Sequence, residues 1–237
     1  MAEPKHVVGL SGGKDSTALA LRLAEVEPRD YEYICNATGN ELPEVAEHID
    51  RMAAILGAPV KIVGAGMTLF ELIEQQKMLP NFRSRFCTRI LKIEPTIAYF
   101  ETLPPGSVLY VGLRADEEER KGLYGEDITI RFPMREWGWG LADVWAYLAQ
   151  RGVTIPTRTD CTVCPYQRLG EWHALWRDHP EEYAAGVAIE ERHGHTFRSA
   201  QRDTWPASLA ELAKQFAAGR PIRERKSKIE ACRVCSL

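Results

Sequence analysis

The sequence predicts an α/β fold: a doubly wound, mainly parallel sheet of five strands with a smaller helical C-terminal part. Short apolar stretches alternate with helix-like stretches through about the first 150 residues. This alternation indicates βαβ units with helices on both faces of a parallel sheet. It stops near Pro156, where a Cys-bearing loop and further helical stretches begin. A chain of 237 residues with 45% apolar side chains is also long enough to bury a sizeable core.

The expected strands are five short apolar stretches, at residues 5–10, 31–38, 60–65, 107–114 and 127–134. Helical spacing of apolar residues predicts helices over 17–26, 42–57, 67–78, 89–103 and 140–152. Gly57 is suited to end the second helix, and Pro95 is expected to break or kink the fourth. Further helices are expected near 169–192 and 207–218, before a basic tail. We therefore divide the chain into residues 1–155 and 156–237.

Composition narrows the class of protein. The net charge is −3 with 27% charged residues, so no global field attracts nucleic acid or a membrane. There is no run of 18 or more apolar residues and no basic start followed by an apolar run. We expect a cytoplasmic protein without membrane contact. In such a compartment the six cysteines are expected to be metal ligands or catalytic thiols rather than disulfides.

The stretch SGGKDS, residues 11–16, directly follows the first strand. Its small residues let the backbone approach a ligand and turn N–H groups toward an anion, and the next helix points its positive end at the same spot. Lys14 adds a mobile cation. Asp15 would be repelled by phosphate unless a divalent metal lay between them, which indicates Mg²⁺. The loop matches neither the Walker pattern nor G-x-G-x-x-G, and without a ligand it would be an ordinary strand-to-helix turn.

This stretch resembles the PP-loop of the ATP pyrophosphatases, which cut ATP between the α and β phosphates and leave AMP on a substrate oxygen. The resemblance implies the adenine nucleotide alpha-hydrolase fold, with residues 1–155 as the nucleotide-binding domain. It also implies that ATP and Mg²⁺ are held by the loop residues Ser11, Gly12, Gly13, Lys14, Asp15 and Ser16.

Four more stretches are similar to the phosphoadenylyl-sulfate (PAPS) reductase family within that superfamily. They are residues 36–45, 87–95, 111–121 and 132–156, so the resemblance runs from residue 7 to about 165. It implies that Thr38 and Gly39 line the nucleotide, and that Lys92 and Arg114 also bind it. Thr88 and Leu91 depart from the family pattern, in which a cysteine and an arginine stand at these positions.

Two further departures indicate a different activity from reduction. True reductases act on an activated nucleotide, and their loop usually lacks the Lys-Asp pair that is present here. The C-terminal sequence IEACRVCSL also lacks the family's E-C-G-x-H pattern. The chain is therefore closest in character to ATP-dependent sulfurtransferases that carry an iron–sulfur cluster. In that chemistry an acceptor oxygen attacks the α-phosphorus, Lys14 and Arg114 stabilise the developing charge, and sulfur then displaces AMP.

The spacing C-x-x-C-P at Cys161 and Cys164 lets one turn supply two thiolates to one metal centre. The resemblance implies that Cys87 joins them around a [4Fe-4S] cluster, which gives three ligands. The fourth iron could stay open to hydrosulfide, or Cys232 or Cys235 could bind it. The cysteine pattern also allows a Zn²⁺ held by the two C-x-x-C pairs, or redox thiols without metal.

The runner-up function is an APS or PAPS reductase, in which Cys232 or Cys235 attacks the sulfonyl sulfur and a thioredoxin-like protein resets the thiol. The third is a non-catalytic nucleotide-binding subunit. A sulfurtransferase would need a sulfur donor and an acceptor, which could be a nucleic-acid base, a backbone phosphate or a metabolite. Arginines at 83, 85 and 89 flank Cys87 and could contact phosphates. The sequence leaves open whether the chain forms a homodimer.

Overall fold

The structure is a computed structural model that describes residues 2–117, 119–120, 124–125 and 127–222. Its centre is a sheet of five strands in the order β3-β2-β1-β4-β5, and every pairing is parallel. The strands are β1 (His6–Gly9), β2 (Tyr31–Cys35), β3 (Val60–Ile62), β4 (Val108–Tyr110) and β5 (Thr129–Arg131). The predicted doubly wound fold is confirmed. Since the chain winds outward from β1 in both directions, the carboxyl ends of β1 and β4 border the crevice where such sheets bind ligands.

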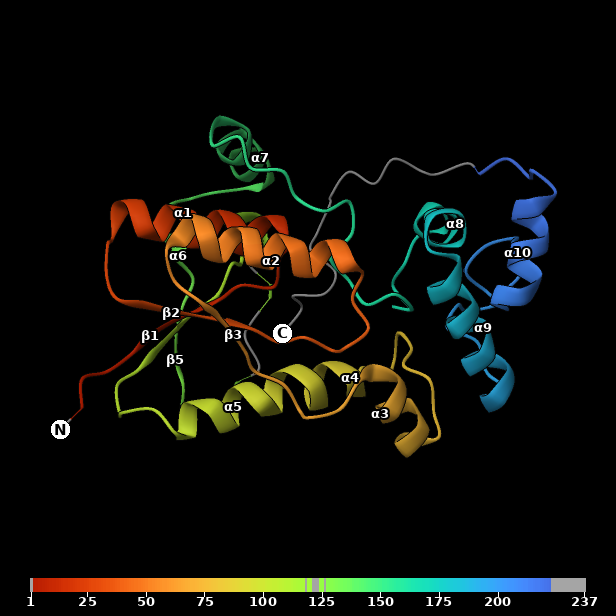
Figure 1. Cartoon of the computed structure of the whole chain (residues 1–237), viewed down its shortest axis with the longest axis horizontal. Helices are drawn as coiled ribbons and strands as arrows, with labels where there is room; N and C mark the ends of the chain where they lie inside the picture. The colour runs from red at the N-terminus through yellow and green to blue at the C-terminus, as the bar shows by residue number, and fades with distance from the viewer. Residues whose placement is uncertain (1, 118, 121–123, 126, 223–237) are drawn as a thin grey trace.

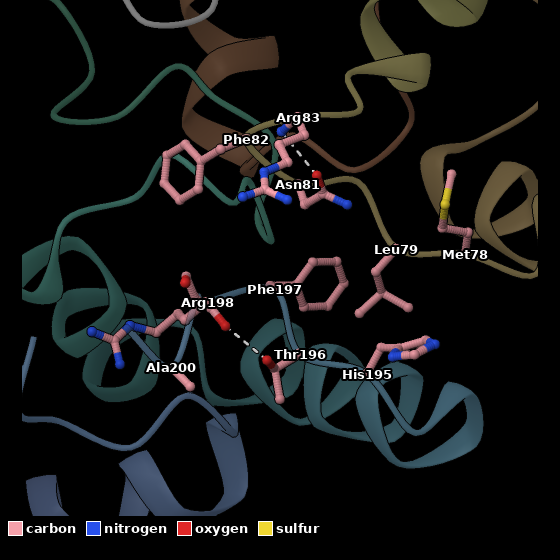
Figure 2. A pocket seen from close by; sticks show the side chains of 11 residues that line it. Met78, Leu79, Asn81, Phe82, Arg83, His195, Thr196, Phe197, Arg198 and Ala200 are labelled. Atoms are coloured by element: carbon pink, nitrogen blue, oxygen red, sulfur yellow. Dashed lines mark hydrogen bonds between the residues drawn. The ribbon is translucent and has the colours of Figure 1, made fainter. Parts of the chain in front are cut away.

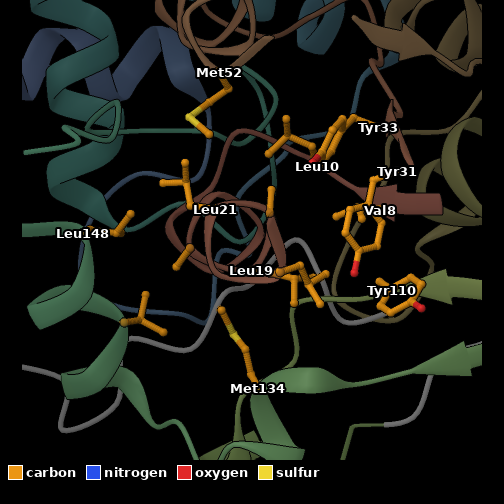
Figure 3. Packing of buried hydrophobic residues seen from close by; sticks show 14 of the residues in the cluster. Val8, Leu10, Leu19, Leu21, Tyr31, Tyr33, Met52, Tyr110, Met134 and Leu148 are labelled. Carbon is orange, nitrogen blue, oxygen red and sulfur yellow. The ribbon is translucent and has the colours of Figure 1, made fainter. Parts of the chain in front are cut away.

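Helices cover both faces of this sheet (Figure 1). One face carries α1 (Lys14–Val26), α2 (Pro43–Leu56) and α7 (Leu141–Gln150), and the other carries α3 (Leu69–Gln76) and α5 (Glu94–Glu101). Neighbouring residues of a strand point to opposite faces, so the central strand β1 contributes to the cores on both sides of the sheet. On β1, Val8 packs under α1 with Leu19 and Met52 (Figure 3), whereas Val7 packs with Phe100 of α5.

The expected break at Pro95 is absent. Helix α4 (Phe86–Thr88), a π-helical turn (Arg89–Ile93) and α5 follow one another without interruption. Proline has no N–H to donate to the preceding turn, and the wider π turn directly before Pro95 accommodates that missing bond. The helix therefore spans residues 86–101, beginning three residues before the predicted start.

Prolines set several other boundaries. Pro133 ends the fifth strand early and starts the short helix α6 (Pro133–Glu136). A 3₁₀ turn, Ala115–Glu117, follows β4. The predicted stretch 169–192 is two helices, α8 (Leu169–Asp178) and α9 (Pro180–His193). His179 lies between them with φ −135° and ψ 65°, outside the helical region that a following proline disfavours. The last described helix is α10 (Leu209–Ala217).

The three C-terminal helices lie beyond one end of the sheet (Figure 1). Their apolar side chains share one buried cluster with α3 and α4. Trp172 and Leu212 belong to it together with Leu72 and Phe86. Helices α8–α10 are thereby held against the segment that carries Cys87, while the division at residue 155 stays a prediction. No helix in the described part of the chain is both long and apolar enough to cross a membrane.

Candidate active site

The PP-loop lies between β1 and α1, and hydrogen bonds made by its serines hold its backbone in place. The Ser11 N–H donates to Ser16 Oγ over 3.1 Å, and that hydroxyl donates to the Gly13 carbonyl over 3.0 Å. Gly12 has φ +79°, and a β-carbon there would lie 3.3 Å from Val45 of α2. Only glycine adopts this conformation without strain, so the residue is fixed by the backbone. Ser16 is thus placed to hold the loop shut, in addition to its predicted ligand contact.

Three predicted residues of this loop region meet in one charged cluster. Arg114 is fully buried at the end of β4, and its Nη1 lies 3.0 Å from both carboxylate oxygens of Asp15, which is 2% exposed. Lys14 Nζ lies 3.2 Å from the same carboxylate. Asp15, which the sequence assigns to Mg²⁺, is therefore shared by two cations. Arg114 also donates through Nε to Asp116, and its Nη2 has no hydrogen-bond partner among the residues described.

A buried histidine behind the loop escaped the sequence analysis. The Nε2 atom of His48 in α2 lies 3.0 Å from the Thr17 hydroxyl in the first turn of α1. Burial, together with the nearby Arg51 cation, lowers the pKa of His48 to about 4. The ring is neutral at pH 7 and connects α1 to α2 beneath the loop. Its place among Val45, Ile49 and Met52 at helical spacing was the signal in the sequence.

The three cysteines of the predicted metal site line one small cavity of about 40 Å³. Cys87 comes from α4, and Cys161 and Cys164 come from the loop before α8. Lys92, which is predicted to bind the nucleotide, also lines this cavity. Arg85, Asn81 and Tyr166 also line the cavity, and none of its lining residues is acidic.

The cysteine loop is attached to the turn after β2. The Thr162 N–H donates to the Asn40 carbonyl over 2.7 Å, and the Thr38 hydroxyl lies 3.1 Å from Cys161 Sγ. The same segment reaches the PP-loop, since a β-carbon on Gly13 would lie 3.4 Å from the Thr159 hydroxyl. The predicted nucleotide loop and the predicted metal ligands are therefore neighbours at one edge of the sheet.

Burial at the cavity favours the neutral form of the three thiols. Burial raises the pKa of Cys161 to about 11 and that of Cys164 to about 12. Burial also raises the pKa of Cys87, against the opposing effect of the Lys92 cation. Arg158 donates to the Cys161 carbonyl, but its Nε and Nη1 have no partner among the described residues. These donors are positioned to compensate the negative charge that thiolates carry when they bind a metal.

No three His, Cys, Asp or Glu side chains within the described ranges are arranged to hold a single metal ion. The predicted residues Cys232 and Cys235, and the tail from residue 223, lie outside those ranges. Cys35 is buried in the core under α1 and α2, and burial raises its pKa to about 11. It takes no part in the cavity, as the sequence predicts for a small apolar side chain in a strand.

The sequence pattern of the phosphoadenosine phosphosulfate reductase domain matches residues 5–174. Among curated proteins, the uncharacterised protein MJ0066 of Methanocaldococcus jannaschii is 24% identical over 192 residues, which is 74% of this chain. The match covers 39% of that protein, so this chain spans about two fifths of its relative's length.

Solved structures with a similar fold have low sequence identity to this chain. Phosphoadenylyl-sulfate (PAPS) reductase from Candida auris is 15% identical with a TM-score of 0.49, covering 65% of this chain and 76% of that one. The U34-tRNA thiolase NcsA from Methanococcus maripaludis, solved with its [4Fe-4S] cluster, is 17% identical with a TM-score of 0.47, covering 100% and 82%. The NH3-dependent NAD synthetase from Campylobacter jejuni is 14% identical with a TM-score of 0.44, covering 94% and 90%.

Proposed function

We propose that this chain, which belongs to the phosphoadenosine phosphosulfate reductase domain family of enzymes, is an ATP-dependent sulfurtransferase. The observation that carries the proposal is the adjacency of its two halves. The segment that carries Cys161 lies against the PP-loop through Thr159 and Gly13, and against the turn after β2 through Cys161 and Thr38. A reaction that activates an oxygen with ATP and replaces it by sulfur needs this proximity, because the adenylated intermediate must meet the sulfur before water does.

The first half-reaction uses the loop at residues 11–16. An acceptor oxygen attacks the α-phosphorus of ATP, the bond from that phosphorus to the bridging oxygen breaks, and pyrophosphate leaves. Lys14 and the loop N–H groups stabilise the charge that develops on the phosphates. The unpartnered Nη2 of Arg114 is the remaining donor of that buried guanidinium. Mg²⁺ would bring Asp15 to the phosphates, in exchange for part of its pairing with Lys14 and Arg114.

The second half-reaction takes place at the cysteines. A sulfur nucleophile at the oxidation level of sulfide attacks the acceptor atom that bears the adenylated oxygen, and AMP leaves with that oxygen. The exchange of oxygen for sulfur involves no net oxidation, so it needs no external reductant. Where the donor is instead a cysteine persulfide, the disulfide that forms must be reduced by a thioredoxin-like partner.

The donor set fits a [4Fe-4S] cluster held by Cys87, Cys161 and Cys164. Each iron of such a cluster takes its own thiolate, so its ligands need not be close enough to share one ion. Lys92, Arg85 and the unpartnered donors of Arg158 supply positive charge around the anionic thiolates. When bound, the cluster would supply an iron able to hold and activate the sulfur nucleophile. A Zn²⁺ site would need further ligands, for which Cys232 and Cys235 are the candidates.

A second candidate function is PAPS or APS reduction, which the family itself and the pairing of Asp15 favour. If Arg114 and Lys14 keep Asp15 occupied, the loop needs no Mg²⁺ and could hold a nucleotide that is already activated. Cys232 or Cys235 would then attack the sulfonyl sulfur, and sulfite would leave after reduction by thioredoxin.

The two functions are separated by what the full chain, purified without oxygen, releases. We expect pyrophosphate and AMP from ATP with Mg²⁺, sodium sulfide and total RNA or DNA as acceptor. Lys14→Ala should lower that rate by about 100-fold or more, because it removes a donor to the transition state. Lys214→Ala, which changes an exposed lysine on α10, is the matched control. Sulfite from PAPS or APS with thioredoxin and without ATP would establish the reductase, and no product in either assay would support the non-catalytic subunit.

Metal analysis of the same preparation tests the cysteine half independently. We expect visible absorbance with about four irons per chain. Cys161→Ser should lose the iron, while Lys14→Ala should keep it. Zinc without colour in the wild-type protein would contradict the cluster.

A further inference from the structure

A second and larger cavity lies beside the cysteine cavity. It has a volume of about 520 Å³ between the segment after α3, residues 78–83, and the segment between α9 and α10, residues 195–200 (Figure 2). Cavities of this size are typical of small-molecule and nucleotide sites. It is not needed for the PP-loop or for the metal ligands, and neither set of residues lines it. Asn81 lines both cavities, so the 78–83 segment is their common wall.

The charge of this second cavity suits an anion. Arg83, Arg198 and His195 line it, and none of its lining residues is acidic. Arg198 is already neutralised, since it is 2% exposed and its Nη2 lies 2.9 Å from Asp203. Figure 2 shows its guanidinium turned away from the cavity, whereas that of Arg83 points from the opposite wall toward it. The Arg83 side chain is exposed and makes no hydrogen bond or ion pair with the rest of the described chain.

An aromatic side chain stands next to that cation. Phe82 is 42% exposed, so part of its ring is open to a ligand. It is held in place from behind: the Tyr166 ring meets it edge-on at 4.7 Å, and the Tyr166 hydroxyl donates to its carbonyl over 3.4 Å. The Arg202 guanidinium lies 5.2 Å from the Phe82 ring. An exposed, positioned ring beside free and stacked guanidinium groups is the combination that binds single-stranded nucleotides.

We propose that this cavity binds the acceptor as a nucleotide unit of single-stranded nucleic acid, with a phosphate on Arg83 and a base on Phe82. The inference rests on the proposed function, to which it adds the substrate class and its site. Tyr166 touches Phe82 on one side and lines the cysteine cavity on the other. A base that stacks on Phe82 is therefore one side chain away from the thiols, while its strand continues over the basic surface of Arg83 and Arg202.

The test measures binding alone, by fluorescence anisotropy of labelled single-stranded RNA and of DNA with the same sequence, without ATP. Phe82→Ala should weaken binding about 5- to 100-fold through lost stacking. Arg83→Ala should weaken it about tenfold and reduce its salt dependence by about one ion. Arg29→Ala is the control, because Arg29 is also exposed but lies just before β2, where it pairs with Glu27. Circular dichroism verifies that each variant is folded.

Equal affinities of the wild type, Phe82→Ala and Arg83→Ala would overturn the inference, as would failure of the wild type to bind either strand at low salt. A duplex that binds as well as the single strand would also overturn it, since its bases cannot reach Phe82. The outcome is independent of the ATP assay. Pyrophosphate release with unchanged binding by the variants would refute this site but not the sulfurtransferase. Binding that depends on Arg83, without any pyrophosphate release, would support this site and refute the sulfurtransferase.

Discussion

The PP-loop and the cysteine cavity are adjacent, but they are built in different ways. The PP-loop is one contiguous segment, closed by hydrogen bonds between residues at most five positions apart. The cysteine cavity joins residues from distant segments, such as Thr38 and Cys161, which are 123 positions apart. Their charges differ as well. In the loop, Asp15 offsets Lys14 and Arg114, whereas the cavity has cations and no lining carboxylate. The charges at the loop are thus paired within the protein, with Arg114 supplied from the segment after β4, whereas the charge of the cavity would be balanced by the thiolates that a metal would create.

The largest effect is expected from removing Asp15, the acid that pairs with Lys14 and Arg114 at the loop. Asp15→Ala should lower the free energy of unfolding by about 3 kcal/mol, because Lys14 would lose its carboxylate and the buried Arg114 would keep only Asp116 and Glu117 as acidic partners. Chemical denaturation measures the loss. Asp178→Ala, which removes an acid from the exposed pair with Arg177, should change stability little and serves as the control. A small loss at Asp15 would mean that the loop is not balanced by this pair.

The pH dependence of stability gives a reference from a region outside the PP-loop and the cysteine cavity. Burial raises the pKa of Glu190 in α9 to about 7, although it accepts hydrogen bonds from the Phe197 and Leu209 N–H groups. Its folded-state pKa is above the ordinary 4.5, so the stability it contributes is complete below about pH 4.5 and is lost as the pH rises through about 7. The loss should be roughly 3 kcal/mol.

Denaturation of the wild type and of Glu190→Gln at several pH values measures this loss. The variant should have a flatter profile between pH 5 and pH 8, and Glu181→Gln at an exposed position of α9 should follow the wild type. Parallel profiles for the wild type and Glu190→Gln would refute the assignment to Glu190.

The turn after β2 lies between the PP-loop and the cysteine cavity. A substitution of its glycine measures how closely this turn is packed. Gly39 has φ +72°, and a β-carbon there would lie 2.6 Å from the Thr68 side chain. Gly39→Ala should cost about 2–3 kcal/mol of stability, from the strained conformation and the displaced Thr68. Gly57→Ala isolates the first effect, because Gly57 has φ +65° with no atom within 4 Å of the added carbon. It should cost about 1 kcal/mol. Equal losses of stability at both positions would show that the Thr68 side chain moves aside without cost in free energy.

The smallest expected effect concerns a single thiol. Burial raises the pKa of Cys161, and its hydrogen bond with Thr38 opposes that rise. In metal-free protein, Thr38→Val should therefore slow the alkylation of Cys161 by iodoacetamide a few-fold, as measured by mass spectrometry of the peptides. Cys164 in the same sample is the internal control. An unchanged rate of alkylation of Cys161 would show that Thr38, in the turn after β2, does not affect the reactivity of this thiol.

The sequence by itself determined the five parallel strands, the helices between them and the glycine turn after the first strand. These are local properties: apolar periodicity, and the need for glycine where the backbone has φ above zero. Local patterns also located each cysteine, and the family resemblance grouped three of them. They predicted a helix over 89–103 but also a break or kink at Pro95, because the π turn that accommodates the missing N–H is not visible in a local pattern.

Only the tertiary structure decided which distant residues meet. Arg114 is buried against Asp15, Lys92 lies with the thiols, and Phe82 packs against Tyr166 from the cysteine loop. Such contacts depend on the order of the strands and on the docking of α8–α10 against α3 and α4. No local pattern encodes either of these. The apolar face of a helix shows that the helix must pack against something, but the partner is decided by the rest of the chain.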